Sequence, residues 1–352
     1  MTLLKFDVSK AVDPTQPFAS FLLSLLNPVD MPSTADIIFK FDTTEQSQRS
    51  AIALHKFILA ARSPDFRRNL STRWKGKRAV KLASIVHPRS FDTVVRYLYS
   101  GEAVDPGREH RENMQLVAES LHLPSEVMEL VNATGLPPTL EIRELKRNEM
   151  SRVQKDFEEF VQREIIERQR TVNCGLLEET RKEMSKENPC WADCLVYIDR
   201  QDGTTTFYYA HIAILTRAEY FLTMFTSAFS ESKTLFEAQD ELPLLQLSID
   251  ADVAPIVLSF LYTDRVEIPR DIALDVLFAA DFLFLTKLKS LAAIALENEA
   301  DPLNELTRED LYEVLRAAWT TDTPRLEYSL PHSKTDLGNS SRRISQKISI
   351  LY

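Results

Sequence analysis

The most constraining feature of this sequence is the repetition of a whole domain. An acidic residue followed by an apolar run opens each copy, at Asp36 and at Asp193, and a histidine in an apolar segment follows, at His55 and at His211. The equivalent aspartates are 157 positions apart and the equivalent histidines 156. Solenoid repeats span about 20 to 50 residues. This spacing therefore indicates two tandem copies of a complete domain.

Each copy has the pattern of a small α+β domain. The residues predict two strands, a helix beginning near the histidine, a second short helix, a third strand and then further helices. The third strands are expected at 79–83 and 244–249, and apolar residues at three- and four-residue steps predict helices around 91–98 and 253–260. Short strands with segregated helices favour a small mixed sheet capped by helices.

The length of the chain favours more than one hydrophobic core. We expect these segments: an N-terminal helical segment over 1–30 with an amphipathic helix at 18–26, a first domain over 31–135, a connector over 136–187, a second domain over 188–300, a short helical extension over 301–328, and a disordered tail rich in Ser, Lys and Arg over 329–352. The connector is charged, but its apolar residues lie on one helical face, which predicts a helix. A coiled coil is the alternative for this segment.

Charge and cysteine usage restrict the class of partner. The net charge is −10 with a pI near 5.3, which disfavours nucleic acid and anionic membrane surfaces as partners. Three cysteines are too few to cross-link two domains, which favours a reducing compartment, the cytosol or the nucleus. The apolar stretch at 18–26 lacks the features of a signal peptide, and no window predicts a membrane span. A protein partner is expected.

Motifs for catalysis, cofactors and metals are not found in the sequence. The seven glycines do not form a phosphate-binding loop, and the histidines and cysteines lack zinc-binding spacing, so we expect no cofactor, no metal and no catalytic residue. Asp36 with His55, and Asp193 with His211, could form catalytic pairs. A histidine repeated at the start of an apolar helix is better explained by a buried hydrogen bond between strand and helix. We therefore predict a structural role for these four residues.

The motifs of the two copies resemble the BTB (POZ) family. Asp36-Ile37-Ile38-Phe39, Leu54-His55-Lys56, Arg62-Ser63-Pro64-Asp65-Phe66 and Leu98-Tyr99-Ser100-Gly101 occur in the family's order, and the second copy follows the same order. The segments 74–77 and 279–289 are similar to the ankyrin-and-BTB branch. The chain has no 33-residue period, so the ankyrin repeats of that branch are absent from it. The resemblance implies a non-enzymatic protein-interaction module.

Many BTB proteins dock on a cullin through a hydrophobic-x-Glu element after the second helix. The stretch 221–232 resembles this element, which implies that Phe229, Glu231 and Met224 contact the cullin. The first copy departs from the pattern, because Trp74 is followed two positions later by Gly76. The alternative for Phe229 is that it packs back onto its own domain.

Two functions follow from the resemblance. The first is a substrate adaptor for a cullin-RING ubiquitin ligase, with the cullin on the second copy and the substrate on the first copy, the connector or flanking segments. The alternative is a scaffold that acts through BTB-mediated homo- or hetero-association without a ligase. Either function is compatible with a homodimer, for which the helix at 18–26 is a candidate contact, or with internal pairing of the two copies.

Overall fold

The computed structural model describes residues 4–6, 18–26, 34–42, 50–137, 139–226 and 241–297. The chain divides into two compact units, a larger one of residues 6–266 and a smaller one of residues 1–5 with 267–352. The predicted segments 301–328 and 329–352, and the predicted docking residues Phe229 and Glu231, lie outside the described residues.

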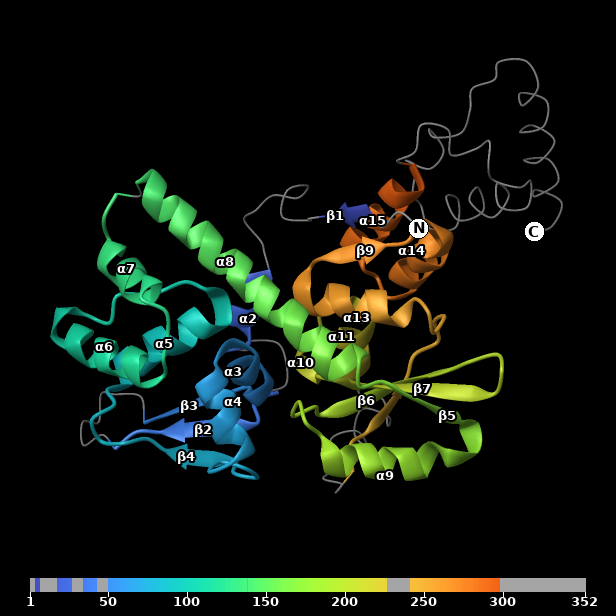
Figure 1. Cartoon of the computed structure of the whole chain (residues 1–352), viewed down its shortest axis with the longest axis horizontal. Coiled ribbons are helices and arrows are strands. Elements are labelled where there is room, and N and C mark those ends of the chain that lie inside the picture. Colours follow the sequence, from blue (N-terminus) through green and yellow to red (C-terminus); the bar gives the residue numbers. More distant parts are fainter. Residues whose placement is uncertain are drawn as a thin grey trace, which may run out of the picture. The chain divides into compact units, whose positions relative to one another are not determined.

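The first copy is a three-stranded sheet with helices on one side (Figure 1). Its elements are β2 (Ile37–Lys40), β3 (Ala51–Leu54), α3 (Lys56–Arg62), α4 (Pro64–Ser71), β4 (Ala79–Lys81), α5 (Pro88–Ser100), α6 (Arg111–Ser120) and α7 (Glu126–Ala133), preceded by β1 (Leu4–Phe6) and α2 (Phe18–Ser24). β2 lies in the centre, antiparallel to β3 and parallel to β4. The sheet is therefore mixed, as the sequence predicts.

Local sequence sets the ends of the helices in this copy. Pro64 and Pro88 occupy the first turns of α4 and α5, where a missing N–H is tolerated. The Ser63 hydroxyl caps α4 by accepting the N–H of Phe66. α5 ends at Ser100, and the next residue, Gly101, adopts a left-handed φ of 76°. A Cβ at Gly101 would lie 2.8 Å from the Glu149 carbonyl oxygen, so this glycine also permits close packing of the next long helix.

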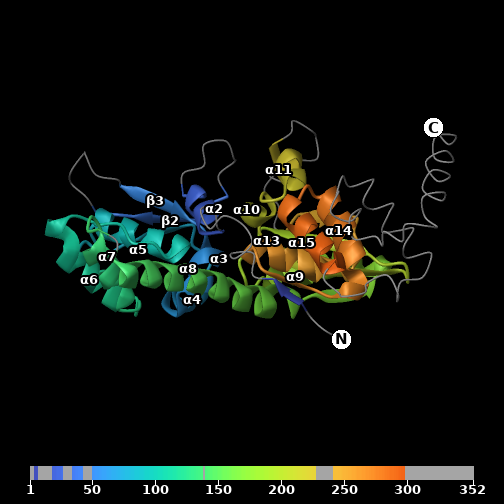
Figure 2. The same cartoon turned by 90° about the horizontal axis from the view of Figure 1, so that it is seen from above.

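The connector contains helices and one strand. It comprises α8 (Leu140–Val161), a π-helical turn (Gln162–Ile166), β5 (Arg170–Asn173), a 3₁₀ turn (Cys174–Leu176) and α9 (Leu177–Glu187). α8 runs beside α5 and α7 (Figure 2). The apolar face predicted for this segment is buried, from Val153 to Ile165. The strand β5 was not predicted.

The second copy repeats the sheet with an additional strand. Its elements in the larger unit are β6 (Cys194–Asp199), β7 (Thr204–Ala210), α10 (Ile212–Leu215), α11 (Glu219–Thr226), β8 (Leu244–Gln246) and α13 (Ala254–Thr263). The strand order is β5-β7-β6-β8, with β6 antiparallel to β7 and parallel to β8. The connector strand β5 thus extends the sheet beyond β7.

The smaller unit consists largely of two packed helices. β9 (Val266–Ile268), at the boundary of the units, leads through a 3₁₀ turn (Arg270–Ile272) to α14 (Ala273–Phe282) and α15 (Thr286–Glu297). β9 pairs with β1 in a two-stranded sheet. Leu277 and Leu288 are fully buried in this helix pair, whereas Phe284, in the turn between the helices, is exposed.

Candidate partner-binding surfaces and the junction between the copies

The equivalent aspartates make the same hydrogen bond in both copies. A carboxylate oxygen of Asp36 accepts the backbone N–H of Lys56 at 2.8 Å, and one of Asp193 accepts that of Ile212 at 2.7 Å. Each bond joins the start of the central strand to the first turn of the following helix. The aspartates therefore satisfy N–H groups that a helix leaves without a partner.

The equivalent histidines are also held alike. The hydroxyl of Tyr99 lies 2.9 Å from Nδ1 of His55, and that of Tyr262 lies 2.6 Å from Nδ1 of His211. Each hydroxyl also accepts the backbone N–H of its histidine, at 3.0 and 3.1 Å. Because the ring nitrogens face tyrosine hydroxyls rather than Asp36 or Asp193, no Asp–His catalytic pair forms between these residues.

The second ring nitrogen of each histidine also has a partner. Nε2 of His55 lies 2.9 Å from the Thr34 hydroxyl, and Nε2 of His211 lies 3.0 Å from the Cys190 carbonyl oxygen. Both imidazoles are almost fully buried. Their two nitrogens each have a hydrogen-bond partner, as buried polar groups require.

Burial shifts the pKa values of the two histidines and the two aspartates. It lowers the pKa of His55 to about 4 and the pKa of His211 to about 3, so both rings are neutral near pH 7. Burial raises the pKa of Asp36 to about 6 and that of Asp193 to about 7, while the backbone N–H of Ile212 acts in the opposite direction on Asp193. The charge of Asp36 further raises the pKa of Asp193.

Aromatic rings join the two copies within the larger unit. The His211 ring stacks on Phe57 of α3 with centroids 4.0 Å apart. Phe157 of α8 lies edge-on to Phe18 of α2 at 5.0 Å and contacts Phe57 at 6.5 Å. Phe160 of α8 lies 6.0 Å from His211. We call these five residues the aromatic junction. The helix α2, predicted as a candidate for a homodimer contact, thus packs on α8 of its own chain.

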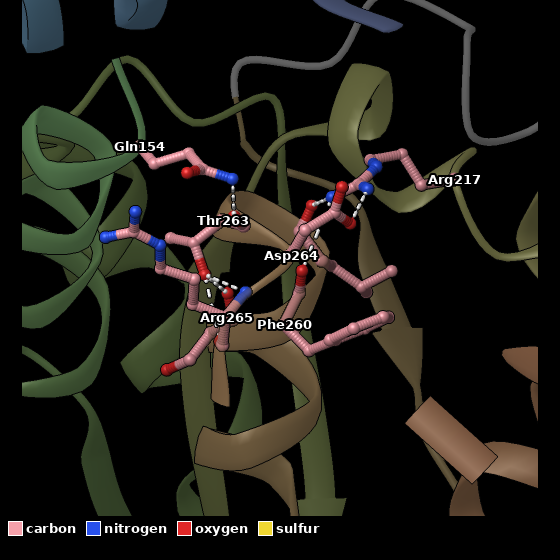
Figure 3. A network of polar contacts seen from close by, with 8 residues as sticks. Gln154, Arg217, Phe260, Thr263, Asp264 and Arg265 are labelled. Carbon is pink, nitrogen blue, oxygen red and sulfur yellow. Dashed lines mark hydrogen bonds and ion pairs between the residues drawn. The ribbon is translucent and has the colours of Figure 1, made fainter. Parts of the chain in front are cut away.

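Two equivalent arginines connect the helices around the junction. Arg62 donates through Nε to the Leu98 carbonyl oxygen at 3.0 Å and pairs with Asp156 of α8. Arg217 donates to the Leu261 carbonyl oxygen, the position equivalent to Leu98. It pairs with Asp264 of its own copy, as Figure 3 shows. The first copy is therefore tied to the connector by an ion pair that the second copy forms internally.

The π-helical turn contributes a buried acidic residue. The Glu164 carboxylate pairs with Arg67 of α4 and, at 2.9 Å, with Arg168. Glu164 is 2% exposed, and a buried charge needs such partners. Gln154 of α8 links the connector to the second copy, because its side-chain amide donates a hydrogen bond to the Thr263 carbonyl oxygen at 3.4 Å (Figure 3).

The predicted docking element begins in α11 of the second copy. Phe221 and Phe225 are buried and lie parallel to each other, with ring centroids 6.2 Å apart, so one side of the helix is anchored to the domain. Met224 is half-buried, and Thr223 and Thr226 are exposed. The helix is described as far as Thr226, and Phe229 and Glu231 follow beyond it.

The corresponding aromatic residue of the first copy points inward. Trp74 follows α4 and is 9% exposed. Its ring packs on Phe39 with centroids 5.4 Å apart and on Phe66 at 5.9 Å. Arg73 covers the Trp74 ring at 4.6 Å. Trp74 therefore belongs to the core of the first copy.

Among the described residues, no three or more His, Cys, Asp and Glu side chains gather where they could hold a metal ion. In the same part of the chain, no helix has both the length and the apolar character needed to cross a bilayer. Cys190 and Cys194 are buried free thiols, and burial raises the pKa of both.

Sequence reasoning found the aspartates and histidines but not their main partners. Tyr99 and Tyr262 occupy the same position in the two Leu-Tyr segments, so the repeat itself carried a signal for them. Arg62 and Arg217 are likewise equivalent. The contact of Phe57 with His211 had no such signal, because it joins two non-equivalent residues from different copies.

Comparison with known proteins identifies the class. The model of the BTB/POZ domain family matches residues 31–133 and 182–300. The chain therefore belongs to the BTB/POZ family and is a protein-interaction module with two BTB domains.

Two relatives cover nearly the whole chain. BTB/POZ domain-containing protein 3 of Schizosaccharomyces pombe is 31% identical over 328 residues, which are 92% of this chain and 56% of the relative. Ankyrin repeat-containing protein YIL001W of Saccharomyces cerevisiae is 29% identical over 380 aligned positions, which are 98% of this chain and 70% of the relative. The predicted similarity to ankyrin-and-BTB proteins is thereby confirmed. The chain spans little more than half the length of the fission-yeast relative.

Proposed function

We propose that this protein is a substrate adaptor for a cullin-RING ubiquitin ligase and that it docks on the cullin through the second BTB domain. The observation that carries the proposal is the anchoring of α11. Phe221 and Phe225 fix one side of this helix in the core, and the chain then continues into the stretch that resembles the docking element. Met224 lies on α11, and Phe229 and Glu231 follow it in the sequence.

The contrast between the copies supports the choice of the second domain. In the first copy the equivalent aromatic, Trp74, packs among Phe39 and Phe66. A residue held in its own core cannot also fill a pocket on a partner. The position equivalent to Glu231 is Gly76, which has no carboxylate.

The contact we propose has a familiar energetic basis. Burying one phenylalanine side chain in a partner contributes about 1.5–3 kcal/mol, and such anchors dominate many interfaces. Glu231 at the rim orients the partner more than it adds affinity.

The test is a calorimetric titration of the full chain with the amino-terminal domain of the BTB-specific cullin. We expect sub-micromolar binding, on the order of −8 kcal/mol or better. Phe229→Ala removes the anchor and should weaken binding at least about tenfold, equivalent to about 1.4 kcal/mol. Glu231→Ala and Met224→Ala should have smaller effects in the same direction.

Two variants serve as controls. Asn69→Ala occupies the position in the first copy equivalent to Met224, and Glu219→Ala removes an exposed carboxylate at the opposite end of α11. Both should bind as the wild type does. Absence of binding by a folded wild-type chain would overturn the adaptor proposal and favour the alternative, a scaffold that acts through BTB association.

We also propose that the two domains pair within one chain. The aromatic junction, the pair of Arg62 with Asp156 and the bond from Gln154 to Thr263 support this arrangement. In this proposal, pairing within the chain takes the place of association with BTB domains of other copies. It leaves the cullin to the second domain and the substrate to the first domain, the connector or flanking segments.

A further inference from the structure

The outer faces of the two sheets differ, although their strands pair in the same register. Ile38 lies between Ala53 and Ala79 in the first copy, and the equivalent Leu195 lies between Tyr209 and Leu244 in the second. The next row on this face is Lys40, Ala51 and Lys81 in the first copy, and Tyr197, Phe207 and Gln246 in the second. The side chains on the first face are alanines, lysines and one isoleucine. Those on the second face are larger and include three aromatic rings.

Connector elements cover the face and edge of the second sheet. Met184 of α9 is fully buried, and its carbonyl oxygen accepts the Tyr209 hydroxyl at 3.0 Å. Ser185 accepts the N–H of Leu242 at 2.8 Å. β5 pairs antiparallel with β7, with Arg170 opposite Phe207. Figure 1 shows β5 beside β7. The chain thus adds a strand and a helix to this sheet.

Among the described residues, no strand or helix lies between α2 and β2 of the first copy, where the second copy has β5 and α9 before β6. Twenty-six residues separate Ile166 from Asp193, whereas nine separate Leu26 from the equivalent Asp36. Ala53, Ala79, Lys40 and Lys81 are all exposed, and Ile38 is 39% exposed.

The edge of β3 offers the hydrogen-bonding groups that β5 uses on β7. Ile38 and Lys40 bond toward β4, through Arg78 and Leu82, so the alternate residues of β2 bond toward β3. The β3 residues that bond to β2 are Ser50, Ile52 and Leu54. The N–H and C=O groups of Ala51 and Ala53 therefore point away from β2, toward the open edge of β3. Ala51 is equivalent to Phe207, which pairs with Arg170 of β5.

We propose that the edge of β3 binds an extended acidic segment of a partner protein, which adds to the sheet antiparallel to β3. Strand addition supplies backbone hydrogen bonds, and side-chain complementarity supplies specificity. The acidic character follows from Lys40 of β2, which neighbours Ala51 on the outer face, and from Lys81 beyond it on β4. The exposed Lys75, Lys77 and Arg78 lead into β4, at the far edge of the same sheet. Lys81 pairs with Asp42 at 3.0 Å. These five basic residues belong to a chain whose net charge is −10.

The test is fluorescence anisotropy of a labelled peptide that alternates valine and glutamate, titrated with the full chain. A peptide that alternates valine and lysine is the matched probe. The acidic peptide should bind at least about tenfold more tightly than the basic one, and its affinity should fall with added salt. Because no cullin is present, the outcome is independent of the adaptor proposal.

Three variants locate the binding. Lys40→Glu reverses a charge on the outer face and should weaken the acidic peptide about tenfold or more. Ala53→Pro removes an outward N–H without removing a bond to β2 and should have a similar effect. Lys146→Glu reverses an exposed charge on α8 and should have none. Thermal unfolding confirms that each variant folds. Equal binding of both peptides, or acidic-peptide binding that survives both Lys40→Glu and Ala53→Pro, would overturn the proposal.

Discussion

At the scale of single residues, the two buried histidines give the clearest link between structure and stability. His211 stacks on Phe57 and bonds through both ring nitrogens, and burial holds its pKa at about 3 against an ordinary value of 6.5. The folded protein keeps the ring neutral, whereas the unfolded chain binds a proton below pH 6.5. The stability that His211 contributes is therefore complete above pH 6.5 and is lost as the pH falls toward 3.

We predict that His211→Gln lowers the free energy of unfolding by about 2–4 kcal/mol at neutral pH, through lost packing and hydrogen bonds. The difference between wild type and variant should shrink below pH 6.5, by up to about 1.4 kcal/mol per pH unit. Urea unfolding at several pH values measures it. Asp36 and Asp193, whose raised pKa values act in the opposite direction, are present in both proteins and largely cancel. A difference that does not change with pH would contradict a neutral buried ring.

The repeat made these residues predictable from the sequence. Asp36 and His55 each have an identical residue at the equivalent position of the second copy. Most other equivalent positions differ between the copies, so these identities are easy to recognise. Their structural role stays a prediction until the substitution is measured. The partners of Phe57 could not be predicted, because they depend on how two surfaces with no sequence relation meet.

At the scale of elements, the contact of α5 with α8 depends on one glycine. Gly101 adopts a left-handed φ of 76°, and a Cβ there would approach the Glu149 carbonyl oxygen to 2.8 Å. We predict that Gly101→Ala destabilises the protein by about 2–4 kcal/mol, the sum of backbone strain and displacement of α8. Gly203→Ala is the matched control, because Gly203 has a φ of 80° but open space around it.

The control should lose only about 1–2 kcal/mol, the cost of the left-handed conformation. Thermal or urea unfolding compares the two variants. Equal losses would mean that α8 adjusts freely to a methyl group at Gly101, and that the close approach of the two helices has no energetic importance.

Most elements of the two copies were predictable, and β5 was not. Helices such as α5 and α13 carry apolar residues at helical spacing over about two turns, which is a strong local signal. β5 has four residues, Arg170–Asn173, within a charged segment that otherwise forms helices. Its strand conformation depends on pairing with β7, a contact between segments distant in the sequence.

At the scale of the whole molecule, internal pairing predicts the mass in solution. If the aromatic junction uses the faces through which the two domains associate, we expect a single species of 40.3 kDa at micromolar concentrations. Light scattering coupled to size-exclusion chromatography measures this mass. A concentration-dependent mass approaching twice that value would show that the domains pair between chains instead.

The difference between the two outer faces has a consequence for how such a protein can evolve. In a symmetric homodimer every substitution appears twice, so a face cannot change in one half and stay constant in the other. Two fused domains are released from that constraint. One sheet here carries aromatic residues together with the β5–α9 cover, while its counterpart displays alanine and lysine. A ligand specific to either face has one site per polypeptide, so the stoichiometry is fixed by the gene and not by assembly.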